Sequence, residues 1–168
     1  MLRVKIFRDC SKKLLGLSQE TYIKTILERF RMYNSKPIDT PIEKRHTLRL
    51  EDCPKLEKKK REMARVPYAS AVESLMYAML CTRLDIYFVV GMVSRNQSNL
   101  GPIHWQAVKR IFRYLRGTSD LILCYQGGDL RLRGYSNVDW ASDRDERKST
   151  TGYAFLLSVV AISWCSKK

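Results

Sequence analysis

Gly101-Pro-Ile-His-Trp-Gln-Ala-Val-Lys-Arg-Ile-Phe-Arg-Tyr-Leu-Arg-Gly117 is the stretch that decides the fold. Proline suits the first turn of a helix, and glycine suits a left-handed cap at its end. Between them, apolar residues recur at the spacing of one helix face: Trp105, Val108, Ile111, Phe112 and Leu115. The stretch therefore predicts an amphipathic helix that begins after Pro102 and ends at Gly117.

A basic stripe lies beside the apolar face of this expected helix. It consists of Lys109, Arg113 and Arg116. A helix that lies along a nucleic-acid backbone would use such cations to contact phosphates. Helices that contact only water often show the same pattern. We name these three residues as candidates for nucleic-acid binding and keep a solvated face as the alternative.

The charge of the whole chain supports a polyanionic partner. The sequence has 31 Lys and Arg against 17 Asp and Glu, which gives a net charge of +14. Such an excess attracts nucleic acid through phosphate contacts and counterion release, although a basic surface with no specific ligand has the same composition. Lys58, Lys59 and Lys60 are further candidates for phosphate binding, in a charged run that is more often solvated.

Upstream of residue 101 the pattern is helical, after a short strand pair. Residues 2–8 and 14–17 suit two strands, and Ser18 suits the cap of a helix that stops before Asn34. Residues 37–52 suit an extended linker. Apolar helices are expected from Pro67 to Cys81 and from Asp85 to Ser94, joined as a helical hairpin.

Downstream of Gly117 the pattern changes to strands. Residues 121–125 and 130–135 flank Gln-Gly-Gly-Asp, which is a strong hairpin signal. Residues 152–158 and 161–164 suit two further strands. The chain is therefore expected to be α+β, with an N-terminal hairpin and helix, a helical middle and an antiparallel sheet at the C-terminus.

Several classes of protein are disfavoured. The five cysteines are far apart and form no C-x-x-C pair, and the two histidines lack a second ligand at zinc spacing. The apolar stretch over residues 68–93 carries Glu73, Arg83 and Asp85, which argues against a membrane span. The first residues lack the build of a secretory signal, so we expect an intracellular location and no membrane partner.

Acidic residues gather on and after the expected strand within residues 130–145. Asp139, Asp143 and Asp145 are the carboxylates. Metal-dependent cleavage of phosphodiesters needs several carboxylates that converge from different elements, because each cation must be neutralised while positions stay open for substrate. Acids in a turn after a strand are usually solvated turn formers. We expect no metal site here, with Asp139 as the one weak candidate.

The same region resembles the opening of a copia-type (Pseudoviridae-like) ribonuclease H. The motifs are Gly134-Tyr-Ser-Asn-Val-Asp-Trp-Ala, Arg147-Lys-Ser-Thr-Thr-Gly-Tyr and Ile162-Ser-Trp-Cys-Ser-Lys-Lys. Upstream, Val66-Pro-Tyr-Ala-Ser-Ala, Cys81-Thr-Arg-Leu-Asp-Ile and His104-Trp-Gln-Ala-Val-Lys-Arg-Ile resemble the connecting region that follows the reverse transcriptase palm in these elements. Residues 14–23 resemble the segment that leaves the palm. The resemblance spans nearly the whole chain.

The resemblance implies a division of the chain. Residues 1–35 would be the end of the palm and the first thumb helix, 36–66 a linker, 67–117 a helical connection, and 118–168 an incomplete ribonuclease H-like domain. The family copies RNA into DNA and degrades the RNA of the hybrid, with Mg²⁺ for both reactions. The metal-binding Tyr-x-Asp-Asp loop is absent from the sequence.

The resemblance also shows where this chain departs from its family. Asn137 occupies the position at which the family has its first metal-binding aspartate. Asp139 is the possible relic of that metal site. Further departures are Glu73, Leu84, Asn96 and Leu100. We therefore expect a catalytically inactive fragment of a Pol polyprotein that needs no cofactor of its own. The alternatives are a non-enzymatic nucleic-acid-binding module and a non-functional pseudogene product.

Overall fold

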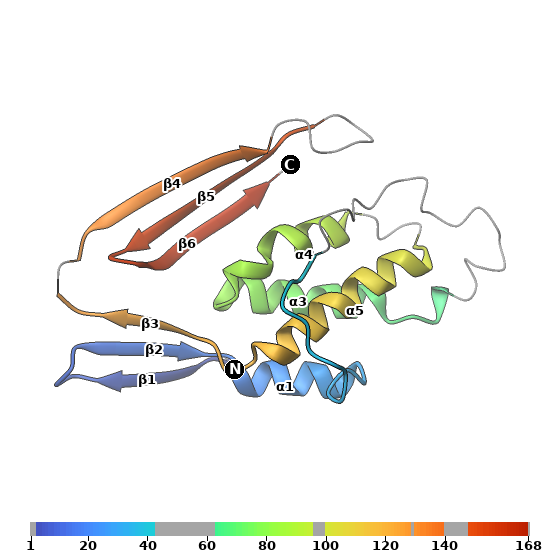
Figure 1. The fold of residues 1–168 in the computed structure, drawn as a ribbon, viewed down its shortest axis with the longest axis horizontal. Coiled ribbons are helices and arrows are strands. Elements are labelled where there is room, and N and C mark those ends of the chain that lie inside the picture. The colour runs from blue at the N-terminus through green and yellow to red at the C-terminus, as the bar shows by residue number, and fades with distance from the viewer. Residues whose placement is uncertain (1–2, 43–62, 96–99, 129, 140–147, 168) are drawn as a thin grey trace.

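The structure is a computed structural model that describes residues 3–42, 63–95, 100–128, 130–139 and 148–167. The α-helices gather at one end, and two three-stranded antiparallel sheets extend beside them (Figure 1). This architecture confirms the α+β prediction. The elements follow in the order β1 (Lys5–Asp9), β2 (Leu14–Ser18), α1 (Glu20–Arg29), α3 (Tyr68–Cys81), η2 (Leu84–Ile86), α4 (Tyr87–Ser94), α5 (Pro102–Gly117), β3 (Ile122–Gln126), β4 (Leu132–Asp139), β5 (Thr150–Leu157) and β6 (Val160–Lys167).

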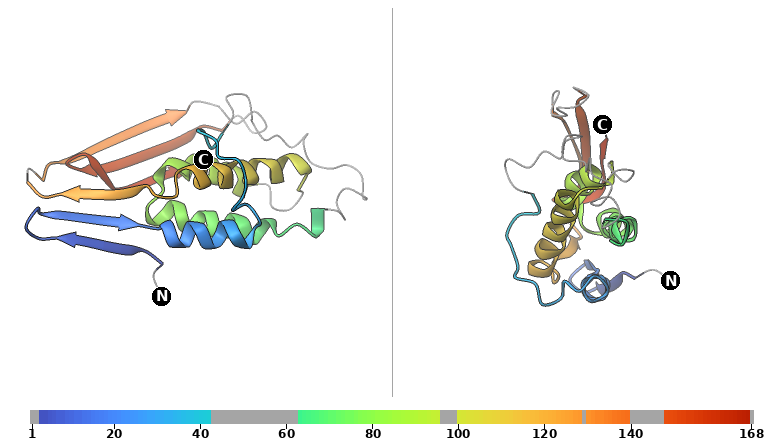
Figure 2. Two further views of the ribbon diagram at one scale, coloured as in Figure 1. Left: turned by 60° about the horizontal axis from the view of Figure 1, so that its bottom comes forward. Right: turned by 90° about the vertical axis from the view of Figure 1, so that its right-hand side faces the viewer.

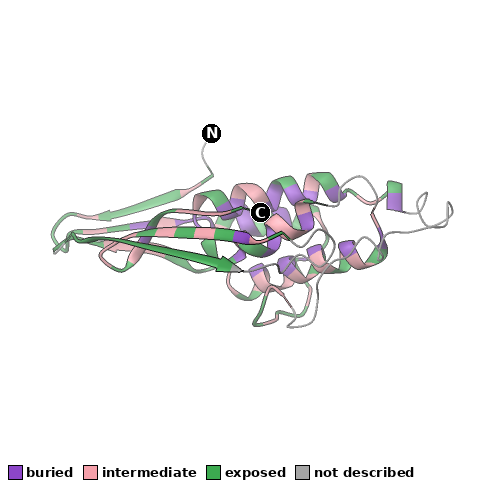
Figure 3. Ribbon diagram, turned by 90° about the horizontal axis from the view of Figure 1, so that it is seen from above, coloured by how far each residue is buried: buried purple, intermediate pink, exposed green. Residues whose placement is uncertain are grey.

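The hydrophobic core lies among the helices. Val108, Ile111, Phe112 and Leu115 of α5 are fully buried, as the predicted apolar face requires. The ring of Phe112 stacks on that of Phe30 with 5.1 Å between centroids, which joins α5 to the end of α1. Figure 3 shows that buried residues concentrate on the helices. The helices therefore form the folded body that carries the rest of the chain.

The end of α5 differs from its prediction. Gly117 is the last helical residue, and the cap is Thr118 with φ −129°, so no left-handed glycine ends this helix. The Thr118 hydroxyl donates to the carbonyl of Tyr114 at 2.9 Å. Gly117 matters for another reason, since a Cβ there would lie 3.1 Å from the Cβ of Pro37. The glycine lets the segment after α1 pass close to α5.

The first sheet corrects a predicted pairing. Its order is β1-β2-β3, with β3 antiparallel to β2 and Leu17 opposite Leu123. The predicted hairpin between residues 121–125 and 130–135 is therefore wrong, because β3 and β4 belong to different sheets. The hairpin signal was local, whereas β3 pairs with a strand from far earlier in the chain. The division at residues 117 and 118 stays a prediction.

The second sheet has the order β4-β5-β6 and lies against the helices through β6. The indole Nε1 of Trp164 donates to the carbonyl of Met79 in α3 at 2.9 Å. The hydroxyl of Tyr125 in β3 donates to the carbonyl of Ala161 at 2.7 Å, which links the two sheets. Figure 2 shows both sheets extending from the same end of the helical body. The outer strand β4 is exposed from Leu132 to Val138.

The helical hairpin of the middle region is confirmed as α3 followed by η2 and α4. Glu73 is exposed on α3, so its carboxylate turns outward and stays solvated. Among the described residues no helix combines the length and the apolarity that crossing a bilayer requires.

Candidate nucleic-acid interface

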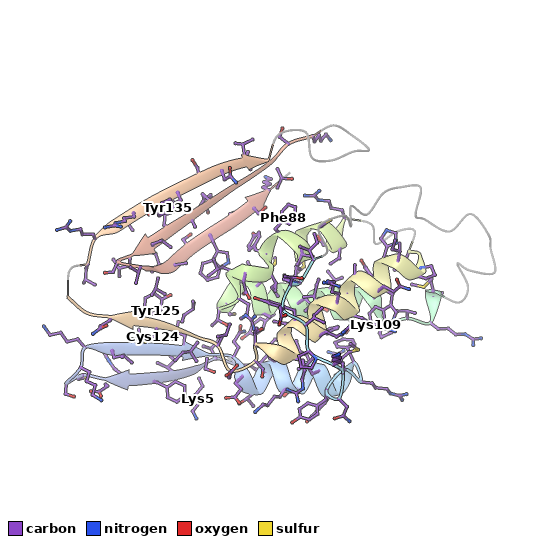
Figure 4. All side chains as sticks on the ribbon, in the orientation of Figure 1. Lys5, Phe88, Lys109, Cys124, Tyr125 and Tyr135 are labelled. Atoms are coloured by element: carbon purple, nitrogen blue, oxygen red, sulfur yellow. The ribbon has the colours of Figure 1, made fainter. Side chains whose placement is uncertain are left out.

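The basic stripe of α5 lies where the sequence places it, next to the buried face. Lys109 is exposed, and Arg113 and Arg116 are half-buried. The ammonium of Lys109 lies 5.7 Å from the ring centroid of Trp105, one turn earlier on the helix. Figure 4 labels Lys109 beside α5. The three cations therefore share one side of a rigid helix, as predicted.

The segment of residues 33–40, which we call the strap, passes over this side of α5. It is the cyan chain that crosses the helices in Figure 1 and runs outside α5 in the right-hand view of Figure 2. The Nε of Arg113 donates to the carbonyl of Lys36 at 2.8 Å, and the Nε of Arg116 donates to the carbonyl of Tyr33 at 2.7 Å. The sequence could not predict these bonds. Their acceptors are main-chain carbonyls, which every residue has, so no residue type marks them.

Two further contacts hold the strap against α5. The guanidinium of Arg116 lies 5.3 Å from the ring centroid of Tyr33. A terminal nitrogen of Arg110 donates to the hydroxyl of Thr40 at 3.1 Å. Stacked guanidinium groups combine cation–π attraction with a fixed plane. The strap is thus attached to α5 near both of its ends.

A second basic surface, not assigned from the sequence, is the β1–β2 hairpin. Lys5, Arg8, Lys12 and Lys13 are exposed on it. The ammonium of Lys5 lies 4.8 Å from the ring centroid of Phe7, which is itself 43% exposed. Figure 4 labels Lys5 on this hairpin. The alternation of basic and apolar residues over positions 2–8 is the sequence signal that marks this surface.

The tip of the hairpin borders a hollow of about 750 Å³ between the two sheets. Its lining includes Arg8, Asp9 and Lys13 from the hairpin and Leu157 from β5. A hydrogen bond from the Ser11 hydroxyl, followed by those from main-chain amides, lowers the pKa of Asp9. Asp9 therefore stays ionised at neutral pH and offsets part of the local positive charge.

The predicted acidic relic lies on β4. Asn137 is exposed and opposite Gly152, and Asp139 occupies the last position of the strand, opposite Thr150. Asp143 and Asp145, like Lys58, Lys59 and Lys60, lie outside the described residues. Within the described ranges no three His, Cys, Asp or Glu side chains come together as metal ligands would.

An ion pair between the buried Arg83 and the partly exposed Asp85 fixes the C-terminal end of α5. Arg83, 2% exposed, donates to both oxygens of Asp85 at 3.0 and 2.7 Å and to the carbonyl of Thr118 at 3.0 Å. The Tyr114 hydroxyl donates to Asp85 at 2.7 Å. Burial alone would raise the pKa of Asp85, but the hydrogen bonds and charge of Arg83, with Tyr114, lower it below its ordinary value.

Comparison with known proteins places the sequence in a family. The chain is 53% identical over 167 residues, 99% of its length, to the retrovirus-related Pol polyprotein from transposon TNT 1-94 of Nicotiana tabacum. The chain belongs to the copia-type retrotransposon Pol family. It is also 39% identical over 155 residues, 92% of its length, to the retrovirus-related Pol polyprotein from transposon RE1 of Arabidopsis thaliana. The predicted family is therefore confirmed.

The chain corresponds to a small part of these Pol polyproteins. It spans 13% of the tobacco relative and 10% of the Arabidopsis relative. A different relative is the secreted RxLR effector protein 161 of Plasmopara viticola, 47% identical over 107 residues, which cover 63% of this chain and 75% of that protein. Neither a protein-family model nor a solved structure matches the chain. The chain is thus a segment of a Pol polyprotein.

Proposed function

We propose that this Pol segment binds nucleic acid without catalysing a reaction, and that other parts of the polyprotein supply the polymerase and nuclease chemistry. The observation that carries the proposal is the row of Lys109, Arg113 and Arg116 along the outer side of α5. The rigid buried face of the same helix holds these cations in a fixed line. A fixed row of cations suits a phosphate backbone, whose charges also lie in a line.

The net charge of +14 supports the same partner. Phosphate contacts release condensed counterions, so the affinity of such a segment falls steeply as salt rises. The exposed cations of the β1–β2 hairpin, with the ring of Phe7 beside Lys5, add a surface that suits phosphates and bases. The segment would thereby help to hold the template or product of a polymerase.

The magnesium chemistry that the family implies does not fit the described residues. Two-metal cleavage needs several carboxylates in one pocket. Asn137, where the family resemblance expects the first metal-binding aspartate, offers only a neutral carbonyl. By sequence, β4, β5 and β6 carry a single acid, Asp139. We therefore propose that this segment contributes no complete metal centre.

A salt titration tests the binding proposal. The full chain and a K109A/R113A/R116A variant are titrated into a labelled RNA–DNA hybrid while fluorescence anisotropy is followed at several salt concentrations. Loss of three phosphate contacts should lower the slope of log affinity against log salt by about 2 to 3 units. A variant with three exposed cations removed elsewhere, R31A/R65A/K167A, controls for net charge. Equal slopes for the two variants would reject the α5 surface.

Assays of turnover test the absence of catalysis. The full chain is incubated with primed template or with an RNA–DNA hybrid in the presence of Mg²⁺ or Mn²⁺. We expect no extension and no cleavage above a heat-treated control. Reproducible turnover that an Asp139→Asn substitution abolishes would overturn this part of the proposal.

A further inference from the structure

We infer that the main-chain carbonyls of Tyr33 and Lys36 position Arg116 and Arg113 as a paired site for the phosphodiester backbone of nucleic acid. This inference rests on the proposed function and adds a role for the strap. The strap has no net charge, since Lys36 is balanced by Asp39. It sets the direction in which the two guanidinium groups present their donors.

The geometry of the two bonds carries the inference. Each carbonyl accepts from Nε, the nitrogen nearest the helix, at 2.8 Å for Arg113 and 2.7 Å for Arg116. Within the part of the chain that the structure describes, the terminal nitrogens of these two arginines make no hydrogen bond. A guanidinium is planar, so fixing Nε fixes the plane of the remaining donors. The protein therefore holds both guanidinium groups through Nε, and their terminal nitrogens keep donors that an anion can use.

The strap is rigid enough to act in this way. Met32, just before it, is 9% exposed, and its amide donates to the carbonyl of Leu27 at 2.7 Å. Pro37 lies so close to Gly117 that a Cβ on the glycine would approach within 3.1 Å. The ring of Tyr33 stacks on the Arg116 guanidinium at 5.3 Å. The carbonyls are thus anchored by packing on both sides.

This arrangement requires arginine. If positive charge alone were needed, lysine would serve equally well. Lysine has one compact ammonium and cannot satisfy a carbonyl with one nitrogen while presenting two others to a phosphate. Arg113 and Arg116 lie three positions apart on α5, so they face neighbouring sites along one helix edge. The terminal nitrogens of the two guanidinium groups therefore suit two phosphate groups of one nucleic-acid backbone.

The decisive variant therefore keeps the positive charge of both residues and removes the planar guanidinium group. The R113K/R116K variant of the full chain should bind the labelled RNA–DNA hybrid about tenfold more weakly at fixed salt, with an unchanged salt slope. R31K/R65K, which alters two exposed arginines, is the matched control and should bind like the parent chain. Lysine variants that bind as tightly as the parent chain would overturn the inference.

A double alanine variant separates this inference from the proposed function. If R113A/R116A loses affinity and salt slope while R113K/R116K does not, the α5 surface binds but the strap does not position it. If R113A/R116A binds like the parent chain, the proposed function fails at this helix, and the inference fails with it.

An NMR measurement reports on the carbonyl bonds without nucleic acid. The Nε–H protons of Arg113 and Arg116 should exchange with water more slowly than that of the exposed Arg31. Gly117→Val should push Pro37 away from α5, speed up that exchange and weaken binding together. Exchange as fast as that of Arg31 in the parent chain would show that the carbonyls do not hold the guanidinium groups, and would overturn the inference.

Discussion

Arg83 and Asp85 form a two-point ion pair at the junction of α3, α4 and α5, with Nε–Oδ1 and Nη2–Oδ2 distances of 3.0 and 2.7 Å. The Arg83 side chain is 3% exposed and that of Asp85 is 32% exposed. The same guanidinium donates to the hydroxyl of Thr118 at 2.6 Å. The pair therefore ties the loop after α3 to the end of the helix that carries the basic stripe.

Removal of Arg83 should destabilise the fold. Arg83→Ala leaves the Asp85 carboxylate and the Thr118 carbonyl without their donor. We expect the free energy of unfolding to fall by about 3 kcal/mol. This value is at the lower end for buried ion pairs, because Asp85 is partly exposed. Urea denaturation measures this loss. Lys24→Ala breaks an exposed pair with Glu20 and should lower the free energy of unfolding far less, because solvent screens exposed pairs. Similar losses for both variants would contradict the buried role of Arg83.

The same ion pair should make the free energy of unfolding depend on pH. The pKa of Asp85 in the folded chain lies below its ordinary value of 3.8, so its contribution is complete above that value and is lost as the pH falls through the folded pKa. Asp85→Asn should therefore be less stable than the parent chain at neutral pH, and the difference should shrink below pH 3.8. Urea titrations at a series of pH values measure it. A difference that stays constant across the range would refute the linkage.

Two leucines of α3 offer a matched test of the core. Leu75 is fully buried, whereas Leu80 is 61% exposed on the same helix. Leu75→Ala should cost about 3 kcal/mol, because it removes buried methyl groups and leaves a cavity. Leu80→Ala should change the free energy of unfolding by less than about 0.5 kcal/mol. Equal effects in thermal or urea unfolding would mean that α3 does not bury the face described here.

The helices were predictable because their signals are local. Proline at the start and apolar residues at helical spacing predicted a helix that begins after Pro102 and ends at Gly117, close to the bounds of α5. The partner of β3 was not predictable, because the Gly-Gly turn signal after it is local and β2 lies far away in sequence. The basic stripe could be identified, but the strap carbonyls that bind its arginines carry no residue-specific signal.

The attachment of the second sheet should depend on Trp164. Trp164→Phe keeps an aromatic ring but removes the donor to the carbonyl of Met79, leaving that half-buried acceptor without its partner. We expect faster amide hydrogen exchange in β5 and β6, with little change in α1 and α5, because the sheet contacts the helices through β6. Mass spectrometry of peptides after exchange measures this. Uniformly faster exchange in all elements would instead indicate global destabilisation.

The free edge of β4 should govern self-association. In the described part of the chain β4 pairs only with β5, and Tyr135 and Val138 are 56% and 53% exposed. A long exposed edge offers unpaired main-chain groups to another chain, and a lysine on such a strand opposes pairing. Tyr135→Lys should therefore reduce concentration-dependent light scattering. Leu121→Lys adds the same charge at a site that is 52% exposed and outside the strands, and should have a smaller effect. If both substitutions reduce scattering equally, charge and not the strand edge controls association.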